Sequence, residues 1–73
     1  MEIGKLIKKR LDAQGYTVIW LSEQLACSRT NVYKIFDKDH LDTRLLMRIC
    51  EILEYDFFKV LSERLRERRR SKK

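Results

Sequence analysis

Side chains able to bind nucleic acid gather in one short segment of this 73-residue chain. Arginine offers a fork of donors that matches the O6 and N7 acceptors of guanine, while threonine and lysine can reach base edges or phosphate oxygens. The segment contains Ser28, Arg29, Thr30, Asn31, Tyr33 and Lys34. The types and spacing of these residues indicate contacts with bases and phosphates.

Two short apolar stripes flank the segment and predict the helices that position it, at about 18–25 and 29–36. Between them, Ala26 is small enough for a sharp corner, Cys27 can point inward as a small hydrophobe, and Ser28 can cap the second helix. Stripes that face each other leave the opposite face of the second helix open, so the sequence predicts a helix-turn-helix. The stripes are Val18, Leu21 and Leu25 in the first helix, and Val32, Ile35 and Phe36 in the second.

Periodicity in the rest of the chain predicts three more helices, at about 2–14, 44–54 and 57–68. The first is expected to turn Ile3, Leu6, Ile7 and Leu11 inward. There is no proline, and no strand-like alternation is present, so we expect an all-α fold of five helices. The expected signals at the helix ends are Gly15 as a stop, Thr17 as a cap, Asp42 or Thr43 as the next cap, and Asp56 as the last.

The segment from Thr17 to Phe36 resembles the helix-turn-helix of the phage-repressor-like (XRE) family of bacterial and phage regulators. Positions 45–61 are similar to that family's fourth helix and the start of its fifth, so the likeness covers most of the chain. The resemblance implies a lambda-repressor-like domain that binds DNA. The residues that carry it are Leu21, Leu25, Cys27, Val32, Ile35, Ile49, Leu53, Phe57 and Val60.

Four positions depart from the family's pattern. Val18 stands where a phosphate-binding glutamine is frequent, and Phe36 replaces a frequent glutamate. Ser22 occupies a position that is usually alanine, and Ala26 one where glycine is common.

The helix at 29–36 is expected to enter the major groove of DNA, which is about 12 Å wide, by its N-terminal end. Arg29 is then the first candidate for a base contact, followed by Thr30 and Lys34. By resemblance, the family also reads bases from these three positions and holds phosphate near the position of Asn31. The expected phosphate-binding residues are Ser28, Asn31, Tyr33, Lys38 and Arg44.

The positive charge of the chain is concentrated at its C-terminal end. Residues 62–73 contain seven basic and two acidic residues, a net charge of +5, which leaves +1 of the total +6 for residues 1–61. We therefore expect a helix-turn-helix domain over 1–61 and a basic extension over 62–73. The extension is expected to be disordered from Arg68 onward and able to lie along the DNA backbone.

Several functions are not expected. There are no paired carboxylates, nucleophile–base arrangement or glycine-rich phosphate loop, and the chain is small for an enclosed active site, so an enzyme or a cofactor is not expected. Cys27, Cys50 and His40 lack the spacing of a metal site. The cysteines are expected to be buried free thiols, and with no apolar span or signal segment we expect the cytoplasm.

Three functions remain. The first is a sequence-specific regulator of transcription that binds double-stranded DNA as a homodimer. The second is a protein-interaction module such as an antitoxin or a recruited subunit, and the third is a basic amphipathic helix that binds an acidic membrane or RNA. Ile19 and Trp20 bear on the second, since they either pack near Tyr16 or form an exposed apolar patch.

Overall fold

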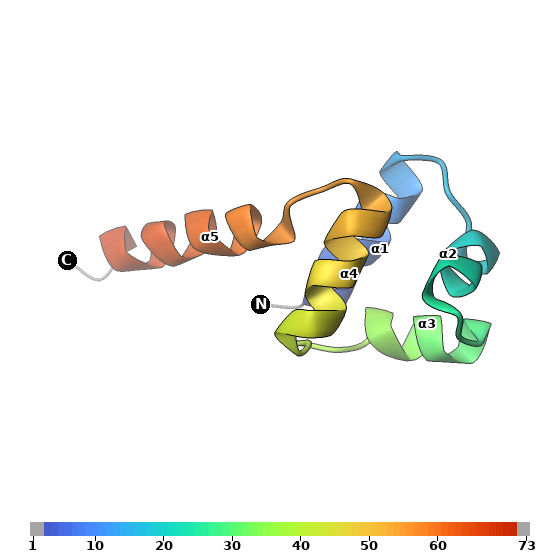
Figure 1. Cartoon of the computed structure of the whole chain (residues 1–73). Coiled ribbons are helices and arrows are strands. Elements are labelled where there is room, and N and C mark those ends of the chain that lie inside the picture. The colour runs from blue at the N-terminus through green and yellow to red at the C-terminus, as the bar shows by residue number, and fades with distance from the viewer. Residues whose placement is uncertain (1–2, 72–73) are drawn as a thin grey trace.

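The computed structural model describes residues 3–71 of the chain, and the side chains of residues 3–69. Five helices and no strands lie within residues 3–71, which confirms the predicted all-α fold. They are α1 (Ile3–Ala13), α2 (Val18–Leu25), α3 (Arg29–Phe36), α4 (Thr43–Leu53) and α5 (Phe57–Ser71). In Figure 1, α1 to α4 form the body of the molecule, and α5 runs away from it.

The predicted helices at 18–25 and 29–36 have the bounds of α2 and α3. The prediction was wrong at the C-terminal end, where α5 continues to Ser71 instead of giving way to disorder at Arg68. Straight-chain residues such as arginine and glutamate are good helix formers, and alternating signs of charge support a helix further. The predicted domain boundary at residue 61 falls inside α5, at the point where its side chains become exposed.

One apolar cluster holds the body together. The predicted stripe of α3 is fully buried, but Val18 and Leu25 in the α2 stripe are only half-buried, as is Leu6 in α1. Both cysteines are free thiols, as expected, and they are half-buried against this cluster. The buried apolar residues are Ile3, Ile7, Leu11, Leu21, Val32, Ile35, Phe36, Leu46, Ile49, Leu53 and Phe57.

Side chains cap four of the helices as predicted. Each accepts a hydrogen bond from a backbone N–H in the first turn, which would otherwise lack a partner. Asp42, not Thr43, caps α4. The four hydrogen bonds are donated by Trp20 N–H to Thr17 (3.0 Å), by Asn31 N–H to Ser28 (3.2 Å), by Leu45 N–H to Asp42 (2.8 Å) and by Lys59 N–H to Asp56 (3.0 Å).

The N-terminus of α1 lies directly on the segment that follows α3. The backbone N–H of Gly4 donates to the carbonyl oxygen of Lys38 at 3.0 Å, and that of Ile3 donates to Asp39 at 3.3 Å. These bonds satisfy donors that a helix start leaves unpaired. Helix α3 itself packs against both α1 and α2.

Candidate nucleic-acid interface

The turn between α2 and α3 is short and tightly hydrogen-bonded. Ala26 adopts the left-handed conformation, with φ 54° and ψ 44°. The N–H groups of Ala26 and Cys27 donate to the carbonyl oxygens of Glu23 (3.2 Å) and Ser22 (3.0 Å). These bonds terminate α2, and Ser28 is the N-cap of α3. Three residues, 26–28, thus connect the two helices in a tight turn.

Burial divides α3 into an inner and an outer face. Val32 is 0% exposed, and Ile35 and Phe36 remain below one tenth exposed. All eight residues that we expected to contact DNA are exposed, whether on α3 or nearby. They are Ser28, Arg29, Thr30, Asn31, Tyr33, Lys34, Lys38 and Arg44.

The three residues expected to contact bases lie on the outer face of α3. Residues four apart on a helix are neighbours, so Tyr33 lies one turn after Arg29, and Lys34 one turn after Thr30. Tyr33 is 55% exposed, and its ring meets Phe36 edge-on at 6.2 Å. Tyr33 therefore lies within the group of residues expected to read bases, although the sequence alone suggested that it contacts phosphate from the side.

The structure also shows which hydrogen-bond donors of Ser28 and Asn31 are available to a phosphate. The Ser28 oxygen accepts the N–H of Asn31, so that N–H is not available to an anion. The hydroxyl proton of Ser28 and the side-chain amide of Asn31 remain available as donors. Lys38 lies in the segment that joins α3 to α4, and Arg44 lies in the first turn of α4.

A shallow groove of about 300 Å³ runs along the side of α3 that faces α4. Its apolar floor includes Leu25, Cys27, Ile35 and Leu45, and its polar lining residues are Asn31, Lys34, Lys38 and Arg48. Three cations therefore border α3 on this side. They favour the binding of an anion such as a DNA phosphate.

Arg48 is a candidate that sequence reasoning missed. It is exposed, and its Nη2 donates to the carbonyl oxygen of Gln24 near the end of α2 at 3.3 Å. This bond holds the guanidinium beside the groove and leaves its other N–H groups available as donors. Only the hydrogen bond from α4 to the end of α2 identifies the position, because within α4 itself Arg48 is one more polar residue on an exposed face.

Ile19 and Trp20 were expected either to pack near Tyr16 or to form an exposed apolar patch, and the two residues differ in this respect. The Trp20 ring stacks on Tyr16 with centroids 3.9 Å apart and an interplanar angle of 8°. Ile19 is 52% exposed. Trp20 thus packs near Tyr16, whereas Ile19 contributes apolar surface on α2.

No group of three or more metal-ligating side chains is found within the described part of the chain. Among the same residues, none of the helices combines the length and apolar character needed to cross a membrane. No protein-family model, curated protein or solved structure matches this chain. Its function is therefore inferred from its own geometry.

Proposed function

We propose that this protein is a sequence-specific regulator of transcription that binds double-stranded DNA through a lambda-repressor-like helix-turn-helix. In this proposal α2 lies across the DNA backbone and α3 enters the major groove. The observation that carries the proposal is the two-sided character of α3. One face is buried against α1 and α2, and the other presents Arg29, Thr30, Tyr33 and Lys34 to solvent.

The dimensions of α3 suit the groove. A helix of eight residues is about 12 Å long, so its outer face spans a few base pairs. Arg29 would bond to guanine O6 and N7, and Thr30 and Lys34 would contact neighbouring base edges. Lys38, Arg44 and Arg48 would hold the flanking phosphates and fix the register of α3 on the DNA.

A homodimer would place two α3 helices on a pseudo-palindromic site, with their centres about 34 Å apart along the DNA. Each half-site would then be read by the same residues. The free, half-buried thiols of Cys27 and Cys50 fit a reducing compartment such as the bacterial cytoplasm.

The proposal is tested first by selecting bound duplexes from a random DNA pool at physiological salt. We expect an enriched inverted repeat with guanine at the position that Arg29 reads. Enrichment of no sequence, with salt-sensitive binding still present, would contradict sequence-specific recognition. The exposed Ile19 would then favour the second function, a protein-interaction module.

The role of Arg29 is tested by Arg29→Ala on the selected site. Removing a pair of hydrogen bonds to guanine costs about 1–3 kcal/mol, so affinity should fall about 5- to 150-fold and preference at that base pair should disappear. Lys8→Ala is the control, because Lys8 is an exposed cation on α1, outside the proposed interface. A loss of affinity in Arg29→Ala that is equal for all sequences would contradict base reading by this residue.

A further inference from the structure

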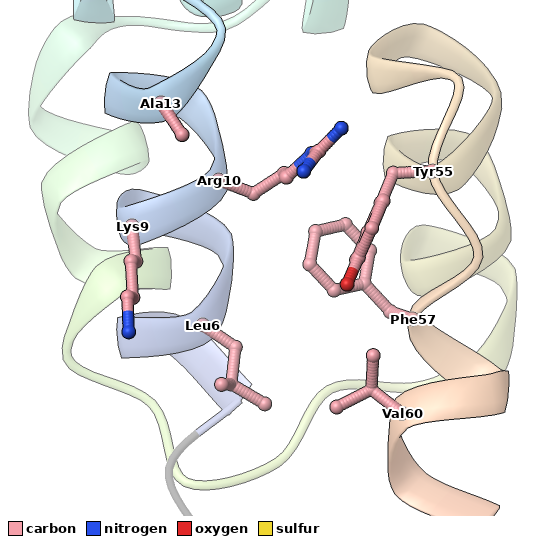
Figure 2. A pocket seen from close by; sticks show the side chains of 7 residues that line it. All are labelled: Leu6, Lys9, Arg10, Ala13, Tyr55, Phe57 and Val60. Atoms are coloured by element: carbon pink, nitrogen blue, oxygen red, sulfur yellow. The ribbon is translucent and has the colours of Figure 1, made fainter.

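A second groove lies between α1 and the start of α5. Its volume is about 220 Å³. Figure 2 shows α1 on one side of this groove, and the first turn of α5 with the segment before it on the other. The groove shares no lining residue with the groove beside α3, so it is separate from the proposed DNA-binding surface. Its lining residues are Leu6, Lys9, Arg10, Ala13, Tyr55, Phe57 and Val60.

One end of the groove between α1 and α5 is apolar. In Figure 2, Leu6 on α1 and Val60 on α5 lie on its two sides. Both are half-buried, whereas Phe57 is 1% exposed. The ring of Phe57 meets the ring of Tyr55 edge-on, with centroids 4.9 Å apart. An apolar ring or short chain placed here would be removed from water by both helices.

The other end of the groove contains a guanidinium that is held in place. The guanidinium of Arg10 lies over the ring of Tyr55, 4.2 Å from its centroid. Stacking of this kind uses the face of the guanidinium, while its N–H donors point outward in the plane. The Nε of Arg10 is buried and has no hydrogen-bond partner among the described residues. The guanidinium therefore retains capacity to bind an acceptor.

The charges around the groove favour an anion beside Arg10. Lys9 adds a second cation, and none of the lining residues is acidic. Glu54 and Asp56 are exposed and do not line the groove. Glu63 comes one turn after the apolar end, so its charge opposes an anion at that end. A ligand with one negative group would therefore place that group beside Arg10 and its apolar part at the other end.

The volume of the groove limits the size of the ligand. Drug-sized ligands occupy pockets of about 300–1,000 Å³. A groove of about 220 Å³ suits a smaller molecule with a single ring or a short chain. The rings of Tyr55 and Phe57 favour an aromatic body, since aromatic rings pack well against one another.

We propose that the groove between α1 and α5 binds a small aromatic carboxylate, of the size and chemistry of phenylacetate. The carboxylate would accept hydrogen bonds from the guanidinium of Arg10, which matches its geometry, and Lys9 would add positive charge. The aromatic ring would lie between Leu6 and Val60, against Phe57. This site goes beyond the proposed function and does not depend on it, because its binding is measured without DNA.

The first test is a titration of the isotope-labelled chain with sodium phenylacetate at constant ionic strength, followed by the backbone amide shifts in NMR spectra. We expect saturable shifts at residues 6–13 and 55–60, and none of similar size in α3. Phenethyl alcohol has the same ring without the charge, so it should bind at least about tenfold more weakly. Shifts that do not saturate, or equal affinities for the two ligands, would overturn the proposal.

Arg10→Met tests the contact with the carboxylate. Methionine keeps an unbranched apolar side chain beside Tyr55 but has no N–H donor. The affinity for phenylacetate should fall at least about tenfold, and the affinity for phenethyl alcohol should change by less than about twofold. Arg66→Met is the matched control, because Arg66 is exposed on α5 and does not line the groove. Equal losses for the two ligands in Arg10→Met would contradict a bond between Arg10 and the carboxylate.

Val60→Ala tests the position of the aromatic ring. It shortens the apolar wall that both ligands would contact, so it should weaken both by a similar factor of about two to five. A loss confined to phenylacetate would contradict the placement of the ring beside Val60. Circular dichroism checks that each variant keeps its helices, and the comparison of the two ligands on the wild-type chain tests the proposal without any variant.

Discussion

Gly4 shows how a single residue fixes the position of α1 relative to α3. A Cβ atom at this position would lie 2.3 Å from the carbonyl oxygen of Phe36 and 2.4 Å from that of Ile35. Both neighbours are backbone atoms, so a rotamer change cannot relieve the overlap. Glycine is therefore required here by close packing, and not by its backbone conformation.

We expect Gly4→Ala to lower the free energy of unfolding by about 2 kcal/mol. The cost of forcing α1 away from α3 exceeds the gain of about 1 kcal/mol that alanine brings to a helix. Urea unfolding followed by circular dichroism measures the change. Lys9→Ala, at an exposed position of the same helix, should change stability by less than about 0.5 kcal/mol. A Gly4→Ala variant as stable as wild type would show that α1 can shift at no cost in stability.

The sequence predicted individual residues well where local chemistry decides their role. The four caps and the exposed face of α3 follow from residue type and helical period alone. Gly4 and Arg48 could not be identified in this way. The importance of Gly4 comes from Phe36, and the position of Arg48 from Gln24, and both partners lie far away in the sequence.

At the scale of elements, the turn between α2 and α3 carries a conformational cost. Ala26 has a φ of 54°, in the left-handed region that costs an L-residue about 1–2 kcal/mol. Glycine avoids this cost, which is why it is common after the last turn of a helix. Ala26 is therefore a strained residue in this turn.

Ala26→Gly is expected to raise the free energy of unfolding by about 0.5–1 kcal/mol, because relief of strain outweighs the extra freedom of glycine in the unfolded chain. Thermal unfolding measures the effect. The control is Ala13→Gly at the other alanine of the chain, which has helical geometry at the end of α1 and should reduce stability. Equal decreases in the two variants would argue against strain at Ala26.

At the scale of the whole molecule, α5 separates the two basic regions of the chain. In Figure 1 its C-terminal end lies at the opposite end of the molecule from α2 and α3. Charge effects in solution fade over about 8 Å at physiological salt. The sequence showed that the tail is basic, but the direction of α5 depends on Phe57, Tyr55 and Arg10, whose packing cannot be read from periodicity.

This geometry yields a prediction for the salt dependence of DNA binding. Replacing Lys38, Arg44 and Arg48 with glutamine removes three positive charges. The slope of log K against log salt should then become less steep by up to about 0.9 for each DNA phosphate contact that is lost. The matched variant neutralises three exposed arginines on the outer turns of α5, Arg64, Arg68 and Arg69, and removes the same charge. Because the described end of α5 points away from α3, we expect the slope of this variant to change by less than the amount for one phosphate. Binding to the selected site, measured by fluorescence anisotropy at several salt concentrations, gives both slopes. A larger change in the α5 variant would show that this helix lies along the DNA, and an unchanged slope in the first variant would show that Lys38, Arg44 and Arg48 do not neutralise phosphates.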